Sequence, residues 1–378
     1  MHKLSYTDRK EDFLLKVAII GGGFAGIVCA LQLERYGVIP DLFERNERLA
    51  EPYRHAGAVL EIVLRPIKDP IQYLNQKYNI YLKPSGLVKK AVHISPSACS
   101  IIKGNLGYFL NRGADYESID NILARNLKSN IYLRTEADYK DLKKVYDYVV
   151  VASGYPNEAK ESGIWQNIIK MSIKGAVVTG SFDINTFIVW INKDYCRSGY
   201  AYLAPFNNRE ASLILAVNDI NPNKIDIYWE KFIETEKLDY KITESFKKVH
   251  YAGFAHPHKI GNVYFIGNAG GCLDPLLGFG IFPSVVTASE AAKSIVYRTD
   301  YESGIKKTVE LNMKLLEFRK AFSRLDNCGY DLLIRSLGLP GVNLLVYRWT
   351  KINAVNAGYS VLKPINTILQ LRNNAQRK

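Results

Sequence analysis

A glycine-rich turn between an apolar run and a helical segment constrains this chain more than any other feature. Residues 21–26 read Gly-Gly-Gly-Phe-Ala-Gly and follow the apolar run Val17–Ile20. In such a turn Gly21 permits the tight bend, Gly23 lets the backbone approach a pyrophosphate, and Gly26 lets a helix pack closely on the strand. The pattern predicts a dinucleotide-binding strand–turn–helix unit. The alternative is a glycine-rich turn with a purely structural role.

The residues after this turn complete the pattern of a βαβ unit. A helix is expected over Phe24–Tyr36 and a second strand over Ile39–Phe43. The first helical residues, Phe24 and Ala25, offer unpaired N–H groups to phosphates. Glu44 ends the second strand, where an acid can accept hydrogen bonds from a ribose diol, and Arg45 beside it is assigned to the same site.

Length and composition fit a folded protein of about two domains. The chain has 378 residues, of which 47% are hydrophobic and 23% charged. The first sixteen residues are rich in charge, and the apolar run after them is too short to cross a bilayer, so neither secretion nor membrane spanning is expected. The five cysteines are scattered without a CxxC pair, which favours a reducing, cytoplasmic location.

The chain has a net charge of +13, and the C-terminal end is its most distinctly basic part. From Leu332 onward the chain carries seven Lys and Arg residues and no Asp or Glu, interleaved with apolar residues. This composition is typical of a segment that lies on a membrane surface, and it predicts a peripheral position on the cytoplasmic membrane surface with no nucleic-acid partner. The alternative is an ordinary helical tail with solvated basic residues.

Further strands and helices are predicted from their periodicity. Two apolar runs, Tyr148–Ala152 and Val263–Ile266, are expected to join the parallel sheet. A second, antiparallel sheet is predicted from Ala176–Thr179, Thr186–Ile191, Gly199–Ala204 and Ser212–Val217. Helices are predicted over Ser284–Tyr297 and Glu310–Leu325, and the helical tail beyond is expected to be interrupted at Pro340, Gly341 and Pro364.

These elements predict an α/β fold with a Rossmann-like domain, an inserted antiparallel-sheet domain and a helical C-terminal region. The expected cofactor domain is discontinuous and comprises residues 14–60, 100–155 and 250–300. The substrate domain would take residues 61–99 and 156–249, and the helical region residues 301–378.

A second motif narrows the choice of cofactor. Residues 263–281 read VYFIGNAGGCLDPLLGFGI, an apolar strand followed by a loop and the start of a helix. This stretch resembles the flavoprotein family of geranylgeranyl reductases and, more distantly, aromatic-ring hydroxylases, which carry GDAAG followed by DPxxGxGI. The resemblance implies an FAD-binding Rossmann-like fold. It also implies that Asn268 reaches the ribityl chain and that the backbone around Gly278, Gly280 and Ile281 lies beside the flavin ring. Asp274 of the same motif is assigned to the cofactor site.

Weaker similarities follow in the order that the family shows. Arg112 resembles the arginine ahead of a family helix, and residues 149–154, ending at Gly154, resemble the turn that returns the chain to the cofactor. Ala137 is assigned to the same cofactor site. The stretch 199–205, with Tyr200 and Tyr202, resembles the YxWxFP strand that lines the cavity over the flavin in the reductases.

Three departures from the family pattern concern the site itself. Asn268 replaces the usual Asp, and Tyr202 replaces the Trp of YxWxFP. His55 stands near the place where many geranylgeranyl reductases carry a Cys. His55, Tyr200 and Tyr202 are therefore the candidate catalytic residues, with His55 as a proton donor. The alternative for His55 is packing beside the cofactor.

Two other groups are weaker candidates for chemistry. His256 and His258 are two histidines on a loop without an acid or Cys at ligand spacing, so no metal site is predicted. Cys272 lies in the flavin-proximal loop and is interpreted as a small buried residue.

The chain contains one dinucleotide fingerprint, which argues against a second domain for NAD(P)H. Electrons would then come from NAD(P)H bound transiently or from a ferredoxin-like protein. The aromatic residues of the second sheet suit a hydrophobic small-molecule or lipid substrate. The resemblance implies an FAD-dependent reductase of carbon–carbon double bonds in an isoprenoid lipid. The alternatives are an FAD-dependent monooxygenase of an aromatic or quinone-like substrate and a flavin-binding electron-transfer or non-catalytic protein.

Overall fold

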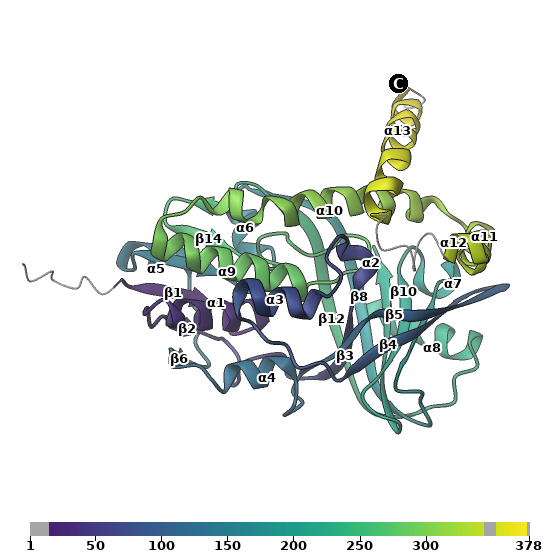
Figure 1. Ribbon diagram of the computed structural model, residues 1–378, viewed down its shortest axis with the longest axis horizontal. Coiled ribbons are helices and arrows are strands. Elements are labelled where there is room, and N and C mark those ends of the chain that lie inside the picture. Colours follow the sequence, from purple (N-terminus) through teal and green to yellow (C-terminus); the bar gives the residue numbers. More distant parts are fainter. Residues whose placement is uncertain (1–14, 344–352, 376–378) are drawn as a thin grey trace, which may run out of the picture.

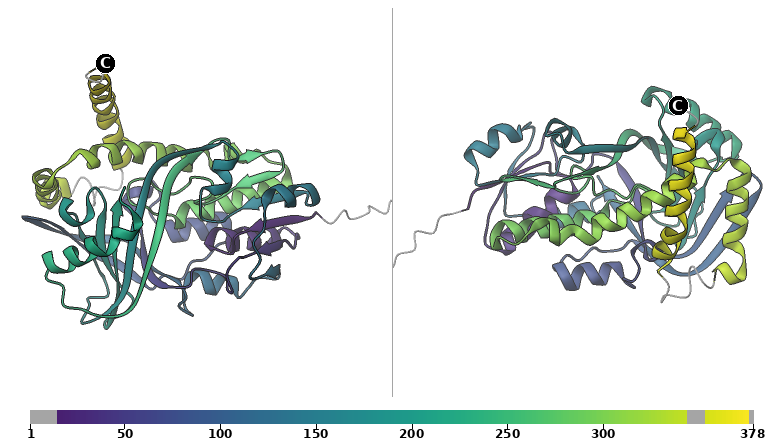
Figure 2. Two further views of the ribbon diagram at one scale, coloured as in Figure 1. Left: turned by 180° about the vertical axis from the view of Figure 1, so that it is seen from behind. Right: turned by 90° about the horizontal axis from the view of Figure 1, so that it is seen from above.

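The structure is a computed structural model that describes residues 15–343 and 353–375. Two sheets lie side by side, and helices cover their outer faces (Figures 1 and 2). The predicted fold class is confirmed: a Rossmann-like unit, a mostly antiparallel second sheet and a C-terminal set of helices. None of the helices within these ranges is both long and apolar enough to cross a membrane.

The first sheet has six strands and contains the predicted βαβ unit. Its order is β13 (Lys259–Ile260), β14 (Val263–Phe265), β7 (Tyr148–Val151), β1 (Val17–Ile20), β2 (Asp41–Phe43) and β6 (Asn130–Tyr132). All neighbours pair in parallel except β13 and β14. The prediction that residues 148–152 and 263–266 join this sheet is confirmed.

Burial on both faces explains the continuous apolar run of β1. Val17 and Ile19 pack into the core formed with α1 (Phe24–Arg35) and α9 (Ile281–Tyr297). Ala18 and Ile20 belong to a second core on the opposite face. A parallel strand covered on both sides has no solvent face, so it shows no polar alternation.

The second sheet has eight strands, more than the sequence predicted. Its order is β12 (Lys241–Ala255), β8 (Trp165–Thr179), β11 (Glu210–Asn218), β10 (Tyr200–Pro205), β9 (Thr186–Trp190), β4 (Gly86–Ser95), β5 (Ala98–Gly113) and β3 (Arg54–Leu60). Neighbouring strands are antiparallel except β4 and β9. The predicted strands correspond to β9, β10, β11 and the end of β8. The others were missed because strands such as β12 begin with a run of exposed and mostly polar residues.

The domain boundaries remain a prediction, but the structure shows which strands belong to each sheet. β3, most of β5 and the end of β12 fall within the ranges expected for the cofactor domain, yet all three strands belong to the eight-stranded sheet. Long strands of this sheet therefore reach the cofactor edge and bring their ends to it.

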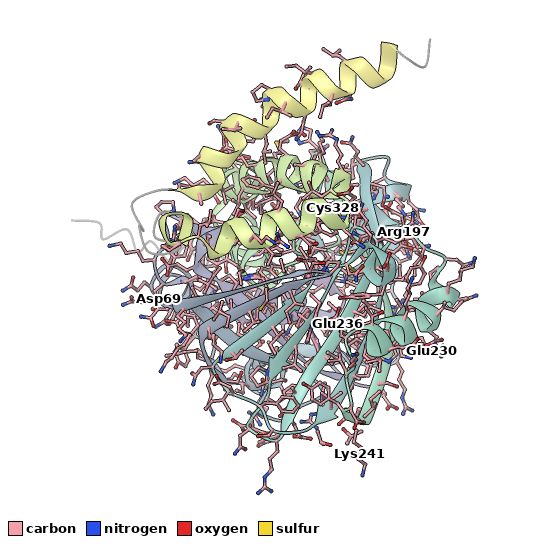
Figure 3. The ribbon with its side chains drawn as sticks, turned by 90° about the vertical axis from the view of Figure 1, so that its right-hand side faces the viewer. Asp69, Arg197, Glu230, Glu236, Lys241 and Cys328 are labelled. Atoms are coloured by element: carbon pink, nitrogen blue, oxygen red, sulfur yellow. The ribbon has the colours of Figure 1, made fainter. Side chains whose placement is uncertain are left out.

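The remaining helices lie around the two sheets. They are α2 (Glu61–Leu64), α3 (Pro70–Tyr78), α4 (Ile119–Ala124), α5 (Tyr139–Val145), α6 (Asn157–Glu161), α7 (Lys193–Cys196), the 3₁₀ turn η1 (Pro222–Lys224), α8 (Ile225–Thr235), α10 (Tyr301–Arg324), α11 (Asn327–Gly338), α12 (Pro340–Asn343) and α13 (Ala354–Ala375). Figure 3 shows α8, marked by Glu230, against the eight-stranded sheet and Cys328 near the start of α11.

One predicted interruption of the C-terminal helices is confirmed and another is wrong. Helix α11 ends at Gly338 and α12 begins at Pro340, a position where a proline loses no helical hydrogen bond. Pro364, in contrast, lies inside α13 without ending it. A proline within a helix removes one backbone hydrogen bond. Near Pro364, the Asn366 amide donates two hydrogen bonds to Glu317 of α10. Helix α10 also begins earlier than expected, because Asp300 caps it by accepting a hydrogen bond from the Ser303 N–H at 3.2 Å.

Candidate cofactor and substrate site

A cavity of about 1180 Å³ lies where the carboxyl ends of β1, β2 and β7 meet the eight-stranded sheet. This edge of a parallel sheet is where ligands bind in open α/β folds. Every residue predicted for the site lines the cavity except Gly26. The lining residues among them are Gly21, Gly23, Phe24, Ala25, Glu44, Arg45, His55, Arg112, Ala137, Gly154, Tyr200, Tyr202, Asn268, Asp274, Gly278, Gly280 and Ile281.

The glycine turn has the geometry that a phosphate site requires. Gly21 has a φ of +105°, and a Cβ on Gly26 would lie 2.0 Å from the Gly21 carbonyl oxygen, so Gly26 serves helix packing. A Cβ on Gly23 would meet nothing within 4 Å, because this glycine faces the cavity. No side chain caps the N-terminus of α1, so its first N–H groups are left for a ligand.

Glu44 is held rigidly at the end of β2. One carboxylate oxygen accepts a hydrogen bond from the Gly22 N–H at 2.8 Å, and the other accepts two from Asn46, at 2.8 and 2.6 Å. The oxygen that accepts from Gly22 has a further lone pair, so the carboxylate can still accept from a ribose hydroxyl at the cavity edge.

Arg112 is fixed between an acid and an aromatic ring. Its guanidinium donates to both oxygens of Asp120, at 2.7 and 2.9 Å, and lies 4.8 Å from the centre of the Phe24 ring. Burial alone would lower the pKa of Arg112, but Asp120 raises it, so the side chain stays charged beside the start of α1.

The loop from Asn268 to Ile281 forms the other wall of the cofactor region. Asp274 is buried and accepts backbone hydrogen bonds from Leu276 at 2.7 Å and Leu277 at 3.3 Å. Burial raises the pKa of Asp274 to about 6, although these N–H donors oppose the shift. Gly278 has a φ of +71°, and α9 begins after it with no capping side chain. The loop therefore presents backbone N–H groups to the cavity.

The structure adds a half-buried group of charged and titratable residues that the sequence did not indicate. Lys248 and His250, both on β12, line the cavity, where Lys248 forms an ion pair with Glu51 and His250 lies 3.2 Å from the Asn268 amide nitrogen. Burial would raise the pKa of Glu51, but Lys248 holds it below its usual range. Burial lowers the pKa of His250 to about 3. β12 was not predicted, so no sequence signal placed these residues in the site.

His55 is neutral in this environment. Its Nε2 lies 3.7 Å from Glu51, and its buried Nδ1 has no hydrogen-bond partner among the described residues. Burial lowers the pKa of His55 to about 4, although the charge of Glu51 opposes the shift. An imidazole with this pKa carries no extra proton at pH 7, which favours the packing alternative over proton donation.

Tyr200 and Tyr202 form an aromatic wall on β10. Their ring centres lie 6.1 Å apart, and burial raises the pKa of both phenols. The Tyr200 hydroxyl donates to the Leu277 carbonyl, and the Tyr202 hydroxyl donates to the Ala56 carbonyl at 3.1 Å. Both phenols are thus anchored to backbone on either side of the cavity.

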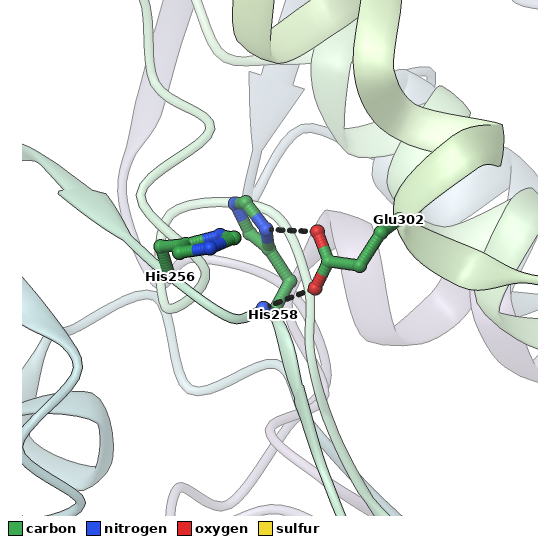
Figure 4. A group of neighbouring side chains, drawn as sticks. All are labelled: His256, His258 and Glu302. Atoms are coloured by element: carbon green, nitrogen blue, oxygen red, sulfur yellow. Dashed lines mark hydrogen bonds and ion pairs between the residues drawn. The ribbon is translucent and has the colours of Figure 1, made fainter.

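His256 and His258 lie close to Glu302, and His258 also lies close to the Cys272 thiol. Glu302 accepts from the His258 ring at 2.9 Å and from its backbone N–H at 2.5 Å (Figure 4). One ligand atom from each of these three residues lies within 4.8 Å of the others. Burial alone would lower the pKa of His258, but Cys272 and Glu302 raise it to about 10. Cys272 and Glu302 therefore favour the protonated form of the His258 ring, and a metal that binds here would have to displace this proton.

Comparisons with known proteins agree on the fold. A family model for an NAD(P)-binding Rossmann-like domain matches residues 19–77. The chain is 22% identical to digeranylgeranylglycerophospholipid reductase of Methanocaldococcus jannaschii, over 89% of this chain and 94% of that relative.

Solved structures show the same similarity. A geranylgeranyl bacteriochlorophyll reductase-like protein from Thermoplasma acidophilum superposes with a TM-score of 0.70 at 15% identity, covering 92% of this chain and 99% of that one. The flavin-dependent halogenase CmlS superposes with a TM-score of 0.61 at 15% identity, covering 96% and 78%. The chain therefore has the fold of flavin-dependent oxidoreductases, and its resemblance to geranylgeranyl reductases is confirmed.

Proposed function

We propose that this chain is an FAD-dependent reductase that saturates carbon–carbon double bonds of an isoprenoid lipid. The observation that carries the proposal is the continuity of the cavity, which runs from the glycine turn past the loop at Asn268 to the wall at Tyr202. Its volume of about 1180 Å³ exceeds the 300 to 1,000 Å³ typical of small-ligand sites, which leaves room for a dinucleotide and a chain-like substrate.

The residues present fit FAD. The open space at Gly23 and the uncapped N-terminus of α1 would receive the pyrophosphate, and Glu44 would accept from the ribose. The N–H groups after Gly280 would face the flavin ring, where they favour negative charge. When bound, FAD would supply the hydride.

The protein side chains shape the substrate space. Reduction of one double bond adds a hydride to one carbon and a proton to the other. The Tyr200 and Tyr202 hydroxyl protons already go to backbone carbonyls, so these phenols orient the substrate and exclude water. Phe187, Met171 and Ile214 extend the apolar lining. The proton would come from water or another acid of the site.

The test is an anaerobic incubation of the FAD-loaded, chemically reduced protein with a geranylgeranyl lipid. A mass gain of two hydrogens per double bond is expected, and no gain under these conditions would contradict the proposal. A chemical reductant removes the question of whether NAD(P)H or a ferredoxin-like protein is the natural electron donor. Each donor can then be tested by its ability to bleach the flavin absorption.

A second candidate is an FAD-dependent monooxygenase of an aromatic or quinone-like substrate. The halogenase similarity and the stacked pair Tyr200 and Tyr202 favour it, since aromatic rings stack on aromatic walls. It predicts oxygen consumption that rises with substrate, whereas the reductase works without oxygen. Bound flavin with neither activity would favour the non-catalytic alternative, which Asn268 and the neutral His55 support.

A further inference from the structure

Helix α13 has two distinct faces, and one of them packs against α10. Val355 and Asn366 are buried against α10, and the Asn366 amide donates to the Glu317 carbonyl at 2.9 Å and to its carboxylate at 2.7 Å. Gly358 packs directly against the Phe318 ring. These positions recur at helical spacing, so they define the face that holds α13 to the body.

The other face carries an exposed apolar stripe. Val361, Ile365, Ile368 and Leu371 are 59%, 46%, 64% and 64% exposed. At about 100° per residue they share one side of the helix, offset from the face that contacts α10. Figures 1 and 2 show α13 projecting from the body, with its C-terminal part clear of the two sheets. Four large aliphatic side chains on a projecting helix form a continuous apolar strip.

The charge of the C-terminal segment indicates which kind of surface the exposed stripe would contact. The chain from Leu332 onward carries seven basic residues and no acidic one. Two of these basic residues, Lys363 and Arg372, lie on α13 itself. An apolar stripe on a basic segment without acidic residues complements a surface that has an apolar interior and anionic groups above it. A membrane containing anionic lipids has this chemistry, whereas a second copy of this basic segment would repel the first.

The foot of α13 lies at the cavity. Asn353 and Asn356 line the cavity together with Leu311 and Leu315 of α10. Helix α13 thus connects the exposed stripe with one wall of the cavity. The idea that a lipid chain passes from the bilayer to the cavity rests on the proposed function. The idea that the stripe contacts a membrane does not depend on it.

We propose that the exposed stripe of α13, formed by Val361, Ile365, Ile368 and Leu371, docks this protein on anionic membrane surfaces. The stripe inserts at the level of the lipid head groups, and basic residues of the C-terminal segment meet the lipid phosphates.

The test measures co-sedimentation of the purified full chain with vesicles of phosphatidylcholine alone and with vesicles containing 30% phosphatidylglycerol. The variant I365E/I368E interrupts the stripe. The control I184E/I227E makes the same charge change at two exposed isoleucines elsewhere, 51% and 64% exposed, one of them on α8. Binding to the anionic vesicles is expected to fall at least tenfold in I365E/I368E and to remain in the control.

Three results would overturn the proposal. They are failure of the wild type to bind anionic vesicles, equal binding of the two variants, and loss of a wild-type dimer in I365E/I368E without any vesicle binding. Thermal unfolding of both variants shows whether they are folded. Loss of vesicle binding together with normal reduction of a detergent-dispersed lipid would support docking and the proposed function separately, because the two readouts are independent.

Discussion

Asn268 is the residue at which the site departs most clearly in charge from the sequence pattern of the flavoprotein family that it resembles. Its amide lies 3.2 Å from His250, whose pKa burial lowers to about 3. An amide is a neutral neighbour and allows the imidazole to stay neutral. A carboxylate at this position would favour the protonated ring instead.

We therefore expect Asn268→Asp to raise the pKa of His250 by about 1–3 units, the range for an acquired opposite charge. The measurement is a proton NMR titration of the histidine ring signals in wild type and variant. His250→Asn identifies the signal. A wild-type His250 that titrates near 6.5 would contradict the burial on which this expectation rests.

His258 gives a pH dependence of stability with a definite sign. Its pKa in the folded chain is about 10, above the 6.5 of the unfolded state, because Cys272 and Glu302 outweigh burial. The imidazolium therefore stabilises the fold fully below pH 6.5, and this contribution is lost as the pH rises toward 10.

The expected result is that His258→Gln lowers the free energy of unfolding most at pH 6 and progressively less toward pH 10. Urea unfolding at pH 6, 8 and 10 measures the free energy of unfolding of both proteins. If the difference in this free energy were the same at all three pH values, His258 would not titrate in this range. Dialysis of both against Zn²⁺ tests the expected absence of a metal at the same place.

At the scale of elements, the contact between α10 and α13 depends on a residue without a side chain. A Cβ on Gly358 would lie 2.3 Å from the Phe318 ring. Gly358→Leu should therefore force the two helices apart, with a loss of about 1–3 kcal/mol from overpacking. Ala357→Leu, one residue earlier and exposed, is the matched control. Limited proteolysis should release the segment after α12 faster in G358L only, and equal rates would contradict this packing.

The whole molecule is organised around a cavity that both sheets line. A ligand that fills this cavity contacts strands of each sheet, so it should raise the unfolding temperature of the entire chain. At a thousandfold excess over its Kd, FAD should add about 4 kcal/mol of stability. Calorimetry of flavin-depleted protein with FAD and with NAD measures this effect.

The control is Gly23→Val, whose side chain would project into open space at the phosphate site without meeting protein atoms. This variant should keep the unfolding temperature of the flavin-free protein and lose the increase with FAD. An equal increase in both proteins would place the cofactor elsewhere. A larger increase with NAD than with FAD would contradict the cofactor assignment.

The sequence by itself determined the parallel sheet, the glycine turn and the residues around the cofactor edge. These features depend on local chemistry: a buried strand must be apolar along its length, and a phosphate turn must be free of side chains. This is why Gly21 and Glu44 could be assigned from the residues themselves, whereas the roles of Asn268 and Gly278 were implied by the resemblance to the flavoprotein family. All four residues line one cavity.

Only the tertiary structure decided which distant residues share an environment. Lys248 and His250 reach the cavity because β12 pairs with β8, and Glu302 meets His258 because α10 passes the end of β12. Burial and such neighbours set the pKa of both histidine rings. Burial lowers the pKa of His55, whereas Cys272 and Glu302 raise the pKa of His258. Local sequence carries no information about either, because a pKa is set by surrounding charge and solvent access, which are known only once the chain has folded.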